Sequence, residues 1–162
     1  MSKSTQAIPA GYENLIPHLV CSPCAEAIEF YKKAFGAEEI CRMPAADGRR
    51  IMHAEIRIGK SVLFLVDDFP DFCPSGKSSS PLALKGTPVT LHFYVQNCDA
   101  VIKRATDAGA TVLMPAADMF WGDRMGMLSD PFGHKWSFAT HQKDLTPEEM
   151  KAAMNSAFAQ KS

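Results

Sequence analysis

Histidine and cysteine are the residue types with the most specific chemistry in this chain, and there are five of each. His18 and His92 are the most informative of them, because they lie 74 residues apart at the same place in an internal repeat. Imidazole can coordinate a metal, orient a ligand, transfer a proton or form structural hydrogen bonds. For this pair all of these interpretations stay open.

Two further residues could complete a site with that pair. His53 and Glu55 lie on one predicted strand, two residues apart, so both side chains point to the same face. The repeat aligns them with Met127 and Ser129, which gives the second half of the chain no equivalent ligands.

The segment from 118 to 141 is rich in aromatic residues and also carries charge. Asp123-Arg124, just after Trp121, could clamp an anionic ligand, but an adjacent acid and base near a strand start also commonly fix a hairpin or an interface. His134 follows a turn glycine and His141 lies at a strand end. Both are predicted to serve the surface or the packing.

The cysteines are odd in number and no export signal is evident, which favours reduced thiols over a disulfide framework. Cys21 and Cys24 have the spacing of a redox or metal motif, but no second pair completes a zinc site. Cys21 aligns with Val95, a strand residue. We therefore predict no functional redox couple at this pair.

Charge and hydropathy limit the binding partners that we expect for this protein. The formal net charge is −1, without a basic block, so we expect no binding to nucleic acid or to an anionic membrane. Residues 1–14 are polar, and no later segment approaches the roughly 18 apolar residues of a membrane span. The expectation is a soluble, cytoplasmic protein.

The elements that must position these residues occur twice, as strand, helix and three strands. We place the first module at 15–67 and the second at 90–141. Their helices are expected to end at Gly36 and Gly109, where a left-handed residue is needed. The predicted first-module elements are a strand at 14–22, a helix at 23–35, a strand at 37–44 and a hairpin at 50–68. Those of the second are a strand at 88–96, a helix at 99–108, a strand at 110–115 and a hairpin at 118–141.

Three segments lie outside the modules: the polar start at 1–14, a linker or mobile lid at 68–89, and a tail at 142–162. The linker is rich in Pro, Ser and Gly and shows no periodicity. In the tail, Thr146, Pro147 and Glu149 have the offsets of an N-cap, a first-turn proline and a capping glutamate. They predict a helix that extends to about Ala159.

Strand alternation predicts which side chains lie under the helices. Trp136 and Phe138 should share that face with their repeat partners Val62 and Phe64. The opposite, concave face should carry Leu63, Leu65, Ser137 and Ala139.

With the duplicated module, the segments "FYKKAFGAEE", "AGATVLMP", "MFWGDRMGMLSDPFGHKWSFATH" and "TPEEM" resemble the vicinal oxygen chelate superfamily, in particular its PhnB-like branch. The resemblance runs from about residue 15 to 150. It implies an α+β fold of two βαβββ modules that form a cup-shaped open sheet, followed by a C-terminal helix. It also implies a small ligand in the cup, usually in a dimer. A single module cannot bury its edge strand, and the linker is long enough for modules to pair within one chain or to exchange between two, so we predict a homodimer.

Metal-using members of that superfamily place a His on the first strand of a module and a Glu on the last. The matching positions here are Leu15 or Ile16, Leu63, Thr90 and Ser137. Aliphatic side chains do not bind cations, and hydroxyls are weak ligands beside imidazole or carboxylate. We therefore expect no metal cofactor at these positions.

For function, the resemblance leaves two classes. The first is a protein that binds a small, partly aromatic or cationic compound without the usual metal. The second is a lyase, isomerase or dioxygenase that uses Zn, Ni, Mn or Fe on His18, His92 and Glu55. The candidate ligand-binding residues are His18, Thr90, His92, Tyr94, Phe120, Trp121, Arg124 and Ser137.

Overall fold

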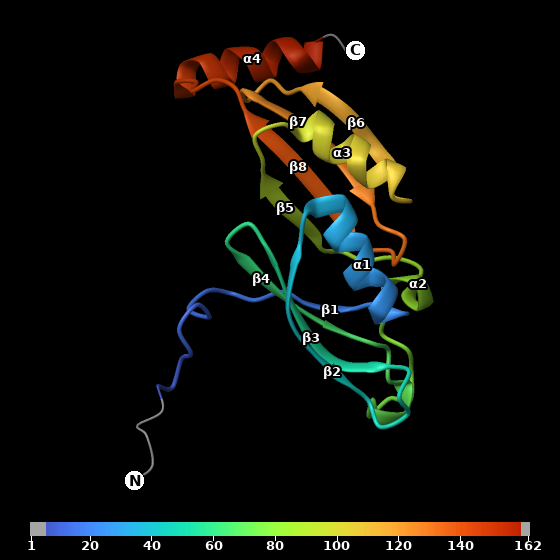
Figure 1. Ribbon diagram of the computed structural model, residues 1–162. Helices are drawn as coiled ribbons and strands as arrows, with labels where there is room; N and C mark the ends of the chain where they lie inside the picture. The colour runs from blue at the N-terminus through green and yellow to red at the C-terminus, as the bar shows by residue number, and fades with distance from the viewer. Residues whose placement is uncertain (1–5, 160–162) are drawn as a thin grey trace. The chain divides into compact units, whose positions relative to one another are not determined.

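The computed structural model describes residues 6–159 and divides them into two compact units. The first unit comprises the chain up to Lys32 together with Gly36–Ser80. The second comprises Lys33–Phe35 and the chain from Pro81 onward. Each unit contains one four-stranded mixed sheet (Figure 1). No helix among the described residues is long and apolar enough to cross a membrane.

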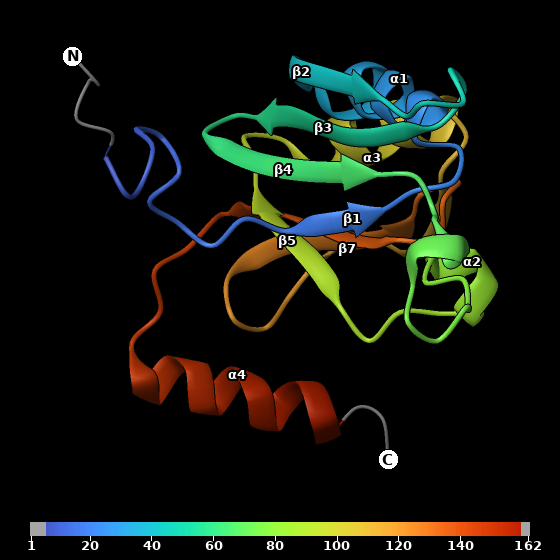
Figure 2. The ribbon, with the colours of Figure 1, turned by 90° about the horizontal axis from the view of Figure 1, so that it is seen from below.

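The first sheet has the strand order β1-β4-β3-β2, with β1 parallel to β4 and the other neighbours antiparallel (Figure 2). Helix α1 ends where predicted, because Gly36 has the left-handed conformation, with φ 69°. The elements are β1 (His18–Val20), α1 (Cys24–Phe35), β2 (Glu38–Pro44), β3 (Ile51–Ile58) and β4 (Ser61–Val66).

The second sheet repeats this topology with the order β5-β8-β7-β6. Helix α3 packs across β6, β7 and β8 (Figure 1). The elements are β5 (Thr90–Tyr94), α3 (Cys98–Asp107), β6 (Thr111–Asp118), β7 (Asp123–Ser129) and β8 (Lys135–His141). The predicted α+β class with two βαβββ modules is confirmed, and the cup they would form together stays a prediction.

The predicted C-terminal helix is α4 (Pro147–Ala159), and its start is set locally. The Thr146 N–H donates to the Glu149 carboxylate, while the Glu149 N–H donates to the Thr146 hydroxyl. This reciprocal pair is a capping box, as the offsets predicted.

The linker contains more structure than its composition predicted. A 3₁₀ turn, η1 (Pro70–Phe72), and a short helix, α2 (Pro81–Leu84), lie within it. The Asp68 carboxylate accepts hydrogen bonds from the Ser78 hydroxyl and from the Ser79 and Ser80 N–H groups. These bonds close the segment 68–80 into a loop on the first unit.

The prediction of which strand side chains are buried is confirmed in the second hairpin and wrong in the first. Trp136 and Phe138 are buried, at 0% and 1% exposure, and the Phe35 ring packs on both within the second unit. In the first unit Leu63 and Leu65 are the buried residues, at 1% and 0% exposure, rather than Val62 and Phe64.

The cause of this error is the length of the turns. His18 pairs with Phe64 across parallel strands, and His92 pairs with Ser137 in the same way, so Phe64 rather than Leu63 is the counterpart of Ser137. The first hairpin turns through Gly59-Lys60. The second needs Pro131-Phe132-Gly133 between a paired Asp130 and His134. The second turn is therefore one residue longer, which shifts the alignment of the two modules by one position after the turn. In a strand, a shift of one position moves each side chain to the other face of the sheet.

The same register corrects the partners of His53 and Glu55. Glu55 pairs with Phe64, and Met127 pairs with Ser137, so Glu55 corresponds to Met127. His53, two residues earlier, corresponds to Met125. The expected alignment with Met127 and Ser129 was therefore wrong by two residues, although the second unit still offers no His or Glu there.

Candidate functional site

The strongest candidate site in the second unit is built around Asp123, the first residue of β7. Strand pairing places Asp123 opposite His141, the last residue of β8, while Tyr94 at the end of β5 pairs with Ala139. Three strand ends therefore meet at one corner of the sheet. Four residues form this Asp123 site: Tyr94, Trp121, Asp123 and His141.

Asp123 is buried, with 4% exposure, and it accepts three side-chain hydrogen bonds. The donors are the Tyr94 hydroxyl at 2.9 Å, the Trp121 indole N–H at 3.1 Å and His141 Nδ1 at 2.8 Å. Burial alone would raise the pKa of Asp123, but the bonds from His141, Tyr94 and Trp121 together outweigh it and lower the pKa. Asp123 is therefore an ionised carboxylate that fixes two aromatic rings and an imidazole.

His141 lies between two carboxylates, because its Nε2 is 2.9 Å from Asp144 while its Nδ1 contacts Asp123. The hydrogen bond to Asp123, then the one to Asp144, raises the pKa of His141 above its ordinary value. An imidazolium here balances only one of the two negative charges. The corner of the sheet is therefore net acidic.

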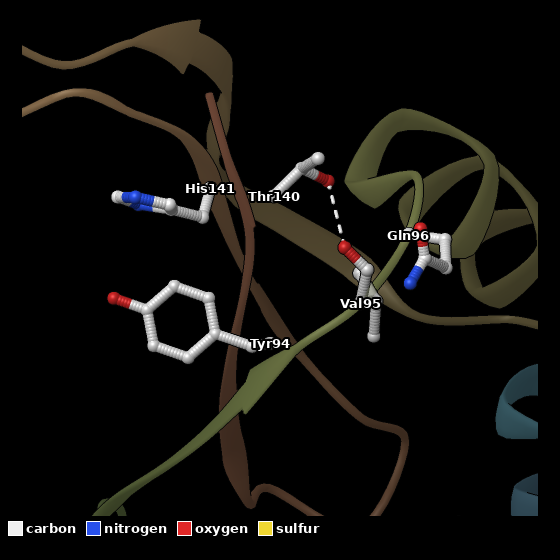
Figure 3. Close-up of a pocket in the computed structure, with 5 residues that line it drawn as sticks. All are labelled: Tyr94, Val95, Gln96, Thr140 and His141. Carbon is white, nitrogen blue, oxygen red and sulfur yellow. Dashed lines mark hydrogen bonds between the residues drawn. The ribbon is translucent and has the colours of Figure 1, made fainter. Parts of the chain in front are cut away.

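Beside these rings lies a hollow of about 480 Å³, lined by Tyr94, Val95, Gln96, Thr140 and His141 (Figure 3). Figure 3 shows the Tyr94 and His141 rings on the same side of the strands. Tyr94 is 62% exposed although its hydroxyl is bound to Asp123. Thr140 is structural, since its hydroxyl donates to the Val95 carbonyl and accepts the Cys98 N–H.

Several predicted residues lie next to this site. His92 contacts the Tyr94 ring edge-to-face at 5.0 Å, and its Nδ1 lies 2.7 Å from the Ser137 hydroxyl. Thr90 is exposed, two residues before His92 on β5. The structure thus brings Thr90, His92, Tyr94 and Ser137 together on one face, with Trp121 at the corner.

Two predicted residues are engaged elsewhere. Arg124 donates to Asp99 at 2.6 Å and to Asp118 at 3.0 Å, so these contacts favour the alternative that it fixes the hairpin. Phe120 contacts the Trp121 ring and also Phe158 of α4, with ring centroids 4.9 and 6.3 Å apart. Its place is in the packing of the C-terminal helix.

Sequence reasoning missed the roles of Asp123 and His141. The hairpin prediction contained one usable signal, because a turn at 130–133 already places residue 123 near residue 141. His134 agrees with its prediction, since it is buried in the second turn, where its N–H donates to Asp130.

In the first unit, His18 lies on the open face of the sheet. Its ring contacts His53 and Phe64 edge-on, at 6.4 and 6.0 Å between centroids. Burial, and then the neighbouring His53, lower the pKa of His18. Glu55 lies on the same face and accepts hydrogen bonds from Tyr12 and His53. Because His18 and His92 belong to different units, a site that joins them stays a prediction.

The Cys21 and Cys24 thiols are buried and unsuited to redox chemistry. Both side chains are 0% exposed, and burial, followed by the Asp67 carboxylate, raises the pKa of Cys24 to about 12. Disulfide exchange requires an accessible thiolate. Their structural role is packing at the start of α1, where the Cys24 N–H donates to Asp67.

A thiol titration of the native protein tests this assignment. We expect Cys41 and Cys73, which are accessible, to react with Ellman's reagent in the folded protein, and Cys21, Cys24 and Cys98 to react only after unfolding, because these three are buried. A Cys21→Val, Cys24→Ala variant should keep the native circular dichroism spectrum. Reversible formation of a Cys21–Cys24 disulfide in the folded protein would contradict the assignment.

Two mixed sheets of identical βαβββ topology, with polar residues on an open sheet face, define a paired-module α+β protein. The model of the Glyoxalase/Bleomycin resistance protein/Dioxygenase superfamily matches residues 15–138. The chain belongs to this superfamily, so the resemblance to the vicinal oxygen chelate superfamily is confirmed, while its PhnB-like branch stays a prediction.

Individual relatives agree with this assignment. An uncharacterized protein of Mycobacterium bovis is 47% identical over 142 residues, which cover 88% of this chain and 92% of that protein. The crystal structure of TioX from Micromonospora sp. ML1 matches with a TM-score of 0.62 and 26% identity, over 80% of this chain and 98% of TioX. A PhnB protein from Bacillus cereus has the same fold, with a TM-score of 0.59 and 16% identity, over 79% of this chain and 99% of that protein.

Proposed function

We propose that this protein is a PhnB-like member of the superfamily that binds a small cationic aromatic compound at the Asp123 site. The observation that carries the proposal is the exposed Tyr94 ring, which is anchored through its hydroxyl to buried Asp123 beside a hollow. Two observations support the assignment to the PhnB-like branch: the sequence segments that resemble it, and the fold shared with the Bacillus cereus PhnB protein.

Charge and shape favour that ligand class. The net acidic corner attracts a cation, and an aromatic ring binds cations over its face and planar groups by stacking. Tyr94 and His141 are already held by hydrogen bonds, so a ligand loses little affinity to ordering them. The His92 imidazole, fixed by Ser137, supplies a further polar group on the same face.

The proposed binding requires no metal at the family's positions. Phe64 and Ser137 occupy equivalent places on the last strands of the two modules, and neither is a strong ligand. In the alternative function, a metal-dependent lyase, isomerase or dioxygenase, His18, His92 and Glu55 would have to hold the ion. Among residues 6–159, His92 contacts Tyr94 and Ser137 of its own unit, while Glu55 contacts Tyr12 and His53 of the other.

A thermal-shift comparison tests the proposal. Matched aromatic compounds that carry a quaternary ammonium, a neutral group or a carboxylate are added to the full chain with and without a chelator. We expect the cationic compounds to raise the unfolding midpoint most, equally with the chelator present. Tyr94→Ala should abolish this shift, whereas Phe72→Ala, which removes an exposed aromatic residue outside the site, should retain it. Equal shifts for all three compounds, or shifts that need a metal, would refute the proposal.

We also propose a homodimer, with modules paired within a chain or exchanged between chains. Edge strands β2 and β6 expose Ile40, Met43, Val112 and Leu113, and such edges commonly pair or are covered. Light scattering at micromolar concentration should give twice the chain mass of 17.7 kDa. A monomer under these conditions would remove this proposal.

A further inference from the structure

A second group of chemically specific side chains lies on the open face of the first sheet, in the unit that does not contain the Asp123 site. Cys41, His53 and Glu55 each offer one ligand atom, and the three atoms lie within 4.8 Å of one another. They provide a sulfur, a nitrogen and an oxygen. Groups of this composition are typical of sites for borderline cations such as Zn²⁺.

The strands bring these residues together. Cys41 on β2 pairs directly with Glu55 on β3, and a register shift between Glu39 and Cys41 sets this pairing. His53 precedes Glu55 by two residues and therefore points to the same face. Ligands on adjacent strands are positioned more rigidly than ligands on loops.

The spacing suits a tetrahedral ion. Zn²⁺ binds sulfur at about 2.3 Å and nitrogen or oxygen at about 2.0 to 2.2 Å, so its ligand atoms lie roughly 3.3 to 3.8 Å apart. His53 Nε2 is 3.1 Å from Glu55 Oε1, already close to this separation. The Cys41 sulfur lies within 4.8 Å of both atoms, and Cys41 is exposed, so its side chain has room to rotate toward them.

Neighbouring residues supply an outer shell. The Tyr12 hydroxyl donates to the second Glu55 oxygen and orients the carboxylate. Phe64 packs against the His53 ring at 4.8 Å between centroids and gives one side of the group an apolar wall. A thiolate and a carboxylate together balance a divalent ion.

We propose that Cys41, His53 and Glu55 form a Zn²⁺ site with a fourth position open to water or to a small ligand. Three protein ligands with one open position are the pattern of catalytic rather than structural zinc sites. The site uses none of the family's metal positions. It shares Glu55 with the alternative set of His18, His92 and Glu55, but its other ligands are Cys41 and His53. It is independent of ligand binding at the Asp123 site.

Cobalt substitution tests the site directly, because Co²⁺ bound to a thiolate gives a charge-transfer band in the near ultraviolet. The tag-free full chain, reduced and freed of metal, is titrated with Co²⁺, and Zn²⁺ is then added to displace it. We expect one Co²⁺ per chain and a band that Zn²⁺ removes. Cys41→Ser should abolish the band, while Cys73→Ser, which changes the other accessible cysteine of the same unit, should retain it.

The other ligands are tested by affinity, measured by competition with a colorimetric zinc chelator. His53→Ala and Glu55→Gln should each weaken Zn²⁺ binding at least about tenfold, and Tyr12→Phe by about ten- to a hundredfold through the loss of its outer-shell bond. Circular dichroism of the metal-free variants checks their folding. A band that survives Cys41→Ser, or Zn²⁺ affinity that none of these substitutions changes, would overturn the site.

Discussion

Asp130→Ala is expected to lower the free energy of unfolding by about 3 kcal/mol or more, because three buried N–H groups lose their acceptor. Asp130 Oδ1 accepts from the backbone N–H groups of Phe132 and His134, both at 2.9 Å. Its Oδ2 accepts from the Trp136 indole N–H, also at 2.9 Å. Trp136 is fully buried, so water does not replace the carboxylate.

Urea denaturation at neutral pH measures this effect. Asp130→Asn retains one acceptor oxygen and should lose less stability than Asp130→Ala. The control is Asp107→Ala, which removes only an exposed pair with Lys103 and should change stability by less than about 0.5 kcal/mol. A loss below about 1 kcal/mol in Asp130→Ala would show that this carboxylate does not support the second turn.

Asp123→Ala is expected to weaken ligand binding at the Asp123 site at least about tenfold, because it releases side chains that the carboxylate now fixes. Tyr94, Trp121 and His141 each lose the acceptor they share. Titration of the cationic aromatic compound found in the thermal-shift screen, by calorimetry, measures the change. Tyr94→Phe should show a smaller loss, because it removes one of these bonds and retains the ring.

Asp123→Ala is also expected to change the pH at which His141 loses its proton. A histidine whose folded pKa is raised contributes stability that is present below its unfolded pKa, about 6.5, and is lost as the pH rises through the folded pKa. In Asp123→Ala the pKa of His141, followed by NMR, should fall toward the unfolded value. Asp144→Ala should lower it less, because the bond to Asp123 remains the larger cause. A His141 pKa that Asp123→Ala leaves unchanged would contradict this account.

The sequence alone determined the features that depend on local chemistry and on the repeat. The capping box at Thr146 and Glu149 was predictable because both partners lie within one helical turn. The end of α1 at Gly36 follows from the backbone freedom of a single residue. The order of elements in each module, and with it the fold class, follows from the periodicity of the apolar residues.

Tertiary structure decided what depends on register and on contacts between distant strands. Leu63 lies on the buried face, contrary to the prediction, because the first hairpin turn is one residue shorter than the second. Side chains alternate between the two faces of a strand, so a difference of one residue exchanges the faces, and the apolar pattern of the strand did not reveal it. The Asp123 site joins the ends of β5, β7 and β8, and the pairing of Cys41 with Glu55 joins β2 to β3 through a register shift. Hydrogen bonds between strands set both arrangements. The hairpin turn indicates that residues 123 and 141 lie close together, but no sequence signal brings Tyr94 to Asp123 or fixes the register that pairs Cys41 with Glu55.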